Sequence, residues 1–184
     1  DPKTGHILTM VGSKDYFDET IDGMVNIATS KRQPGSSFKP FVYATALAKG
    51  YTPETVVFDV KTQFSTACAP SNLSGEYPCY SPDNYDNTFK GPITFRNALA
   101  QSINVAAVKV LYLAGIDPAL DIARRLGITT LVDKARYGLT LVLGGGEVTL
   151  LDMTSAYGVF ANDGVRAPAT GVLRVEDKNE KVLE

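Results

Sequence analysis

The sequence contains no tryptophan, a single histidine (His6) and only two cysteines among its 184 residues. A lone histidine argues against an ordinary Ser-His-Asp triad, and the absence of a Cys-x-x-Cys spacing argues against a metal site. No apolar run approaches the roughly 20 residues of a membrane-spanning helix. The formal net charge of −2 gives no support for nucleic acid binding. The composition therefore favours chemistry carried by side chains alone, without a metal or a cofactor.

The overall composition is that of one ordinary globular domain. The hydrophobic fraction is 44% and the charged fraction is 21%, which indicates neither disorder nor a fibrous repeat. Residues 1–5 have no signal-peptide character, so we expect any membrane anchor of a parent protein to lie outside residues 1–184.

Hydrophobic periodicity and turn residues predict a mixture of helices and strands. Strands are expected at both ends of the sequence, within one sheet, and the stretch 51–91 is expected to be mostly irregular because prolines recur in it. The predicted strands are residues 6–12, 171–177 and 181–183; the predicted helices are 36–49, 94–100, 104–114, 117–126 with Asp117 as N-cap and Pro118 at the first helical position, and 149–161.

The most informative motif places Ser36 three residues before Lys39, directly after Pro34 and Gly35. If a helix begins at Ser36, this spacing puts both side chains on one face. A lysine amine held there can accept the serine proton when desolvation lowers its pKa, so that the serine becomes a nucleophile. The alternative is a serine that opens a helix, followed by a solvated lysine.

A second motif, Ser102-Ile103-Asn104, falls at the break between two predicted helices. Both polar side chains can turn toward one cleft there. Ser102 could relay a proton between Lys39 and a leaving group, and Asn104 could offer its amide to a substrate carbonyl or to Lys39. An asparagine that merely caps the following helix explains the pattern as well.

The two cysteines, Cys68 and Cys79, lie in a segment rich in turn-forming residues. Such a loop has little apolar content, so a local disulfide would stabilise it. Two free thiols in a reducing compartment are the alternative.

Four segments in order, residues 32–40, 81–94, 98–104 and 143–153, resemble the transpeptidase domain of penicillin-binding proteins, especially the bifunctional class A kind. The resemblance implies an α+β fold of the serine transpeptidase/β-lactamase type, with an antiparallel sheet flanked by helices. It also implies that Ser36 is the nucleophile, Lys39 its base, and Ser102 and Asn104 the second motif, with Asn104 binding substrate.

The implied activity is D,D-transpeptidation, which cross-links peptidoglycan stem peptides ending in D-Ala-D-Ala, with acylation by β-lactams. The alternatives are a D,D-carboxypeptidase and a non-catalytic β-lactam-binding sensor. The resemblance further implies an extracytoplasmic domain in the cell envelope, whose parent is anchored in the cytoplasmic membrane. In that compartment we expect Cys68 and Cys79 to form a disulfide.

One departure concerns the family's third motif, Lys-Thr-Gly, which is expected well after the second. The only match is Lys3-Thr4-Gly5, which we interpret as part of an opening turn. We therefore expect residues 1–184 to be the first part of the domain, incomplete and inactive alone, with the remaining C-terminal part as a partner. A phosphate-binding role for residues 144–146 is a weaker alternative, since Glu147 adds negative charge there.

Overall fold

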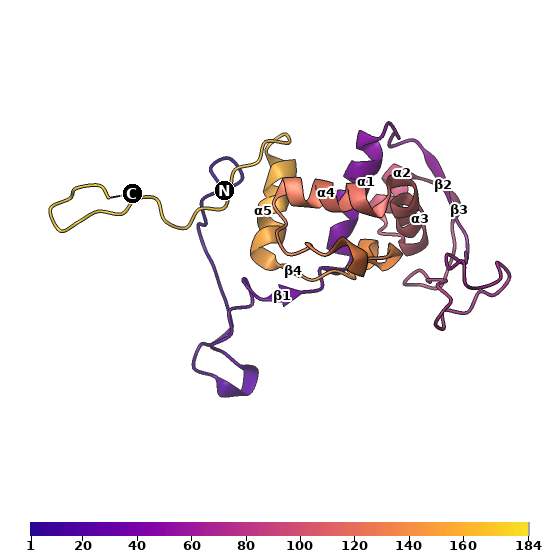
Figure 1. Ribbon diagram of the computed structural model, residues 1–184, viewed down its shortest axis with the longest axis horizontal. Helices are drawn as coiled ribbons and strands as arrows, with labels where there is room; N and C mark the ends of the chain where they lie inside the picture. Colours follow the sequence, from indigo (N-terminus) through magenta and orange to yellow (C-terminus); the bar gives the residue numbers. More distant parts are fainter. Residues whose placement is uncertain (184) are drawn as a thin grey trace. The chain divides into compact units, whose positions relative to one another are not determined.

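The computed structural model describes residues 1–183 and combines helices with short antiparallel strands, which confirms the predicted α+β class (Figure 1). All five predicted helices are present; the one predicted at residues 104–114 has the predicted boundaries, and those of the others are shifted by at most three residues. The helices are α1 (Lys39–Ala48), α2 (Phe95–Ala100), α3 (Asn104–Ala114), α4 (Ile116–Leu126) and α5 (Leu150–Ala161). The strands are β1 (Lys31–Arg32), β2 (Val56–Asp59), β3 (Gly91–Thr94) and β4 (Val148–Thr149), and the 3₁₀ turns are η1 (Glu19–Ile21), η2 (Gly35–Phe38), η3 (Lys134–Arg136) and η4 (Leu139–Leu143).

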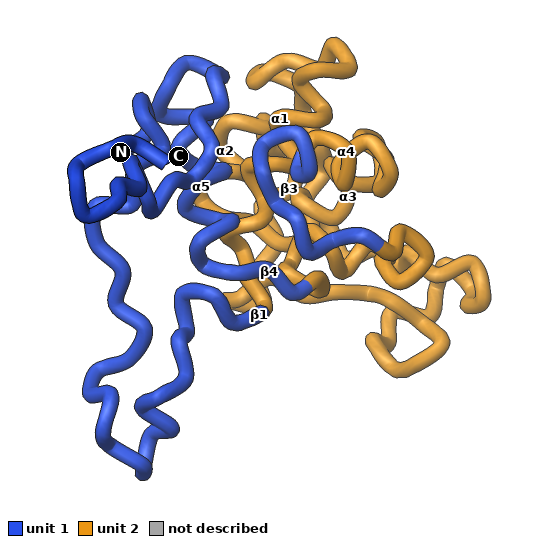
Figure 2. The backbone as a smooth tube through the Cα atoms, turned by 60° about the vertical axis from the view of Figure 1, so that its left-hand side comes forward, with its two compact units in different colours: residues 1–32, 123–132, 147–184 blue, residues 33–122, 133–146 orange. Residues whose placement is uncertain are grey.

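The chain divides into two compact units, which Figure 2 shows in different colours. The first unit comprises residues 1–32, residues 123–132 and the chain from 147 onward. The second unit comprises residues 33–122 and 133–146. Both candidate motifs, at residues 36–39 and 102–104, lie in the second unit, so the site is formed within one compact body.

The core of the second unit lies where α1 packs against α3. Phe41 and Val42 of α1 and Val108 and Leu111 of α3 are fully buried. Helix α3 is apolar on nearly all sides, as expected of a helix surrounded by other elements rather than lying on a surface. Gly115, with φ of 85°, ends it. This packing holds the beginnings of α1 and α3 at fixed positions.

Strands β2 and β3 form an antiparallel hairpin in the second unit (Figure 1). Val56 pairs with Thr94 and Asp59 with Gly91. The prediction that residues 51–91 are mostly irregular is confirmed, and β2 is the exception within this stretch. It was not foreseen because the pairing joins segments separated by a long loop and not by a short turn. Within that loop Cys68 and Cys79 are bonded, with their Cα atoms 5.6 Å apart.

The first α-helix begins at Lys39, so the prediction that it begins at Ser36 is wrong. A helix beginning at Ser36 would need residue 40 to donate a backbone hydrogen bond to the Ser36 carbonyl. Residue 40 is proline and has no N–H. The Lys39 N–H bonds the Ser36 carbonyl instead, which makes the 3₁₀ turn η2, and Pro40 falls in the first turn of α1, where prolines are tolerated.

The helix predicted at residues 117–126 begins one residue earlier than expected. Asp117 was predicted as its N-cap, whereas α4 already starts at Ile116, which places Asp117 and Pro118 inside the first turn. Proline is compatible with this position because the first helical N–H groups have no intrahelical acceptor.

The strands predicted at the two ends of the sequence are reduced to isolated bridges in the first unit. His6 bridges Thr170 in parallel, and Glu176 bridges Val182. A strand needs a continuous ladder with a partner, and within residues 1–183 these segments share only single bridges, so alternation of side chains alone does not make them strands. The predicted adjacency of the two ends is present only at the His6–Thr170 bridge.

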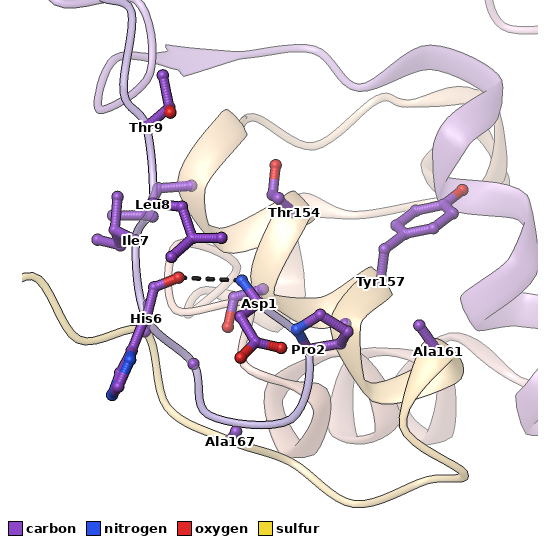
Figure 3. A pocket seen from close by; sticks show the side chains of 15 residues that line it. Asp1, Pro2, His6, Ile7, Leu8, Thr9, Thr154, Tyr157, Ala161 and Ala167 are labelled. Carbon is purple, nitrogen blue, oxygen red and sulfur yellow. Dashed lines mark hydrogen bonds between the residues drawn. The ribbon is translucent and has the colours of Figure 1, made fainter.

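A cavity of about 610 Å³ lies in the first unit, between the beginning of the chain and α5 (Figure 3). The residues that line the cavity include Ile7, Leu8, Tyr157 and Ala161, which are labelled in Figure 3. Asp1 and His6 line it too, and the Asp1 amino group donates to the His6 carbonyl (3.0 Å). Ser36, Lys39, Ser102 and Asn104 do not line it. Among residues 1–183 no helix is long and apolar enough to cross a membrane, and no cluster of three potential metal ligands occurs.

Candidate active site

Ser36 lies in the 3₁₀ turn η2, and its side chain is exposed. Gly35 precedes it with φ of 58°, a left-handed conformation that glycine adopts at little cost. The turn η2 packs against η4. The serine hydroxyl is therefore exposed to solvent, on a turn whose backbone is held in place by packing against η4.

The contact between η2 and η4 depends on Gly144, which ends η4 with φ of 90°. A Cβ atom at this position would lie 2.2 Å from the backbone nitrogen of Gly35 and 2.5 Å from its Cα. Only glycine permits this approach of two backbones. The phosphate-binding alternative for residues 144–146 receives no support, since Gly144 serves packing against the Ser36 turn.

Lys39 is buried, with 1% of its surface exposed, and its amine makes three hydrogen bonds. The Nζ atom donates to the carbonyl oxygen of Ser102 (2.6 Å), to the Ser102 hydroxyl (3.1 Å) and to Oδ1 of Asn104 (2.8 Å). The two motifs that the sequence placed more than 60 residues apart are thus joined at one amine.

Burial shifts the Lys39 amine toward its neutral form. Burial lowers the pKa of the Lys39 amine from 10.5 to about 8, because desolvation disfavours the ammonium. Its three hydrogen-bond partners are all neutral groups. Among the part of the chain that the structure describes, no carboxylate lies within ion-pair distance of this amine. A substantial fraction of neutral amine near physiological pH is the condition for Lys39 to act as a base.

The three bonds of Lys39 indicate which partner can take part in proton transfer. An ammonium has three N–H donors, and all three are used here. A neutral amine has two donors and one lone pair, so one partner must change. The Ser102 carbonyl and the Asn104 amide oxygen can only accept, whereas the Ser102 hydroxyl can also donate. Ser102 is therefore the partner through which a proton can enter or leave Lys39.

The Ser36 hydroxyl makes no hydrogen bond with Lys39 within residues 1–183. The two residues are linked instead through the backbone bond from Lys39 N–H to the Ser36 carbonyl. Catalytic hydrogen bonds are often loose in unliganded enzymes and shorten only when substrate binds.

The only Lys-Thr-Gly sequence, at residues 3–5, forms a turn in the first unit. The Gly5 N–H bonds the Asp1 carbonyl (2.8 Å), and the Thr4 hydroxyl donates to the Asp1 carboxylate (2.8 Å). This is the local turn that the sequence predicted.

Sequence reasoning missed two polar residues of the site, Asn84 and Asp59, which are 4% and 0% exposed. Oδ1 of Asn84 accepts from the backbone N–H groups of Asn104 and Val105 at the beginning of α3. Asn84 lies in a segment that carried the family resemblance, yet no role was assigned to it. Nothing in the local pattern shows that it is buried.

Fold and site together define a mixed α+β protein with an exposed serine followed, one turn on, by a buried lysine with a lowered pKa. The family described as the penicillin binding protein transpeptidase domain matches residues 1–183, and this chain belongs to that family. The membership agrees with the order of motifs along the chain.

Individual relatives support the same assignment. Penicillin-binding protein 1A of Neisseria meningitidis is 36% identical over 185 residues, covering 99% of this chain and 21% of the relative. Penicillin-binding protein 1A of Rickettsia bellii is 36% identical over 183 residues, covering 100% of this chain and 22% of the relative. The chain thus spans about a fifth of the length of these relatives.

Among solved structures, penicillin-binding protein 1A from Haemophilus influenzae superposes with a TM-score of 0.73 and 32% identity, over 89% of this chain and 23% of that one. The PonA1 protein from Mycobacterium tuberculosis, solved in complex with penicillin V, superposes with a TM-score of 0.70 over 86% of this chain and 42% of that one. At 23% identity, this second likeness shows the fold alone.

Proposed function

We propose that this chain carries the nucleophile and base of a D,D-transpeptidase, which cross-links peptidoglycan stem peptides through a serine acyl-enzyme and is acylated by β-lactams. The observation that carries the proposal is the buried Lys39 amine, held by Ser102 and Asn104 and directly following the exposed Ser36 turn. Family membership and the relatives named penicillin-binding protein 1A support it.

In the proposed acylation, the Ser36 oxygen attacks the carbonyl carbon of the penultimate D-alanine, and its proton passes to the neutral Lys39 amine. The peptide C–N bond then breaks. The leaving D-alanine nitrogen takes a proton that Lys39 returns through the Ser102 hydroxyl. An amine of a second stem peptide then attacks the ester carbonyl, the bond to the Ser36 oxygen breaks, and the amine's proton passes through Lys39 to that oxygen, which restores the Ser36 hydroxyl. The Asn104 amide is proposed to orient the donor peptide as well as Lys39.

The test uses the full-length protein that contains these residues, incubated with a fluorescent penicillin and analysed by intact mass and peptide mapping. We expect one adduct, on Ser36, which is absent from Ser36→Ala. The matched control is Ser37→Ala, because Ser37 is the exposed neighbour whose hydroxyl donates to the Pro34 carbonyl (2.6 Å). This control should be acylated like the wild type.

An adduct that persists in Ser36→Ala, or that maps to Ser37, would refute the assignment. Product analysis with a stem peptide ending in D-Ala-D-Ala tests the reaction type. A cross-linked dimer supports transpeptidation, whereas release of D-alanine without cross-linking would replace it by carboxypeptidation. Stable acylation without any turnover of the peptide would indicate a β-lactam sensor.

A further inference from the structure

The turn that presents Ser102 and Asn104 to Lys39 is strained, and the beginning of α3 that follows it has no side-chain cap of its own. Ser102 has φ of 55°, in the left-handed region that non-glycine residues adopt at a cost. Ile103, which precedes α3, offers no side-chain oxygen to its first N–H groups. The N–H groups of Ser102 and Ile103 are bonded locally to carbonyls of α2. The open beginning of α3 has no such partner and needs compensation from elsewhere in the fold.

That compensation comes from Asn84, twenty residues earlier in the chain. Its Oδ1 accepts hydrogen bonds from the N–H groups of Asn104 (3.0 Å) and Val105 (3.1 Å). Asn84 thus caps α3 from a remote segment. The preceding residue contacts the same motif, because the Asp83 carbonyl accepts a hydrogen bond from the Asn104 side-chain amide (3.1 Å).

The orientation of the Asn84 amide is set by the fully buried carboxylate of Asp59. Nδ2 of Asn84 donates to both Asp59 oxygens (2.9 and 3.0 Å) and to the Thr88 carbonyl (2.8 Å). One Asp59 oxygen also accepts from the Lys90 N–H (2.8 Å). A carboxylate can only accept, so the NH₂ group of Asn84 must face it and the amide oxygen must face α3. The Lys109 ammonium lies close enough that Asp59 opposes the lowering of the Lys109 pKa by burial.

We propose that Asn84, oriented by Asp59, is a positioning residue for acylation, which fixes the beginning of α3 so that Ser102 and Asn104 hold the Lys39 amine in place. The inference rests on the proposed function and adds to it two residues that touch neither the nucleophile nor its base. Asn84 acts through the backbone of Asn104, and Asp59 acts through Asn84.

Lys39 is the titratable group that the two motif residues contact directly. Lys39 faces only neutral partners on α3 and on the turn before it. Asp59 is paired with Asn84 and lies near Lys109. The carboxylate of Asp83 accepts a hydrogen bond from the Lys61 ammonium (2.6 Å), and its backbone carbonyl accepts one from the Asn104 side-chain amide. A substitution at Asn84 therefore alters the pH dependence of acylation by changing how deeply the Lys39 amine is buried.

The test measures the rate of acylation by a fluorescent penicillin against pH for full-length Asn84→Ala. Without the Asn84 cap the beginning of α3 loosens and water reaches Lys39, so the lysine pKa rises from about 8 toward its ordinary value. We expect the rising limb of the profile to move to higher pH. Misplacement of the base should also slow acylation at neutral pH on the order of 10- to 100-fold.

The matched control is Gln63→Ala in the same unit. Gln63 is also a side-chain amide with three backbone hydrogen bonds, to the Asn72 carbonyl and from the Ser65 and Tyr80 N–H groups. None of these bonds reaches α3. A purely structural loss should therefore lower the thermal midpoint in both variants, but only Asn84→Ala should displace the pH profile. An undisplaced profile in Asn84→Ala overturns the inference.

A double variant, Asp59→Asn with Asn84→Asp, exchanges the amide and the carboxylate. It replaces Asn84→Ala as the test if that variant does not fold. The new carboxylate can accept from α3 with one oxygen and from the new amide with the other. Recovery of the wild-type profile supports the inference, and a folded double variant with a displaced profile overturns it. Failure of this inference can be told apart from failure of the proposed function. The assignment of the nucleophile is tested separately, by whether Ser36→Ala is still acylated.

Discussion

The pH dependence of acylation follows from the burial of Lys39. The Lys39 pKa is lowered to about 8, because its amine is desolvated and faces no carboxylate. About a tenth of the amines are then neutral at pH 7, half at pH 8 and about nine tenths at pH 9. If neutral Lys39 accepts the Ser36 proton, the acylation rate should rise about tenfold from pH 7 to pH 9 and then level off.

The plateau is the informative part of the profile. A solvated lysine with its ordinary pKa of about 10.4 would still be mostly protonated at pH 9, so the rate would keep rising about tenfold per pH unit. The assay is stopped-flow acylation of the full-length protein by a fluorescent penicillin between pH 6.5 and 10, corrected for hydrolysis of the free reagent. The curve should bend near pH 8.

Two variants make the assignment specific. Lys39→Arg keeps a positive charge that does not dissociate in this range, so acylation should be lost at every pH. Lys49→Ala removes an exposed lysine at the other end of α1 and should leave the profile unchanged. A flat wild-type profile, or one that still climbs beyond pH 9.5, would refute Lys39 as a base made available by burial.

Two further predictions concern the frame around the site. Gly144→Ala should lower the free energy of unfolding by roughly 1–2 kcal/mol, because alanine adopts the left-handed backbone of this position at a cost. It should also slow acylation, because the added Cβ displaces Gly35. The control is Gly138→Ala, since Gly138 has φ of −112° and open space around it. Chemical denaturation of both variants measures this, and equal effects would contradict the close packing. Alkylation without reductant should label neither Cys68 nor Cys79 in the native protein, and replacing both by serine should cost up to about 3 kcal/mol for a loop of this length. Two labelled thiols in protein isolated from its own compartment would show that the disulfide does not form there.

The helices could be predicted from sequence because their signals are local. The apolar run of α3 and the Gly115 that ends it lie within a few residues of one another, and Thr149 caps α5 through the Asp152 N–H. The start of α1 was missed by three residues because the missing N–H of Pro40 outweighed the capping preference of Ser36.

The strands were predicted less well, because a strand is defined by a partner that is distant in the sequence. Strand β2 pairs with β3 across a long loop, and nothing near Val56 indicates this partner. Alternation at residues 6–12 indicated a strand, yet only the bridge from His6 forms within residues 1–183.

The sequence by itself determined which chemistry is available: a serine three residues before a lysine, and a serine and an asparagine at a break between helices. Only the tertiary structure decided that the Lys39 amine is buried and bonded to Ser102 and Asn104, and that Asn84 caps α3. The physical reason is that spacing along a chain fixes which side chains share a turn. Desolvation and hydrogen bonding depend on which distant segments pack together, and those two effects set the pKa of a base.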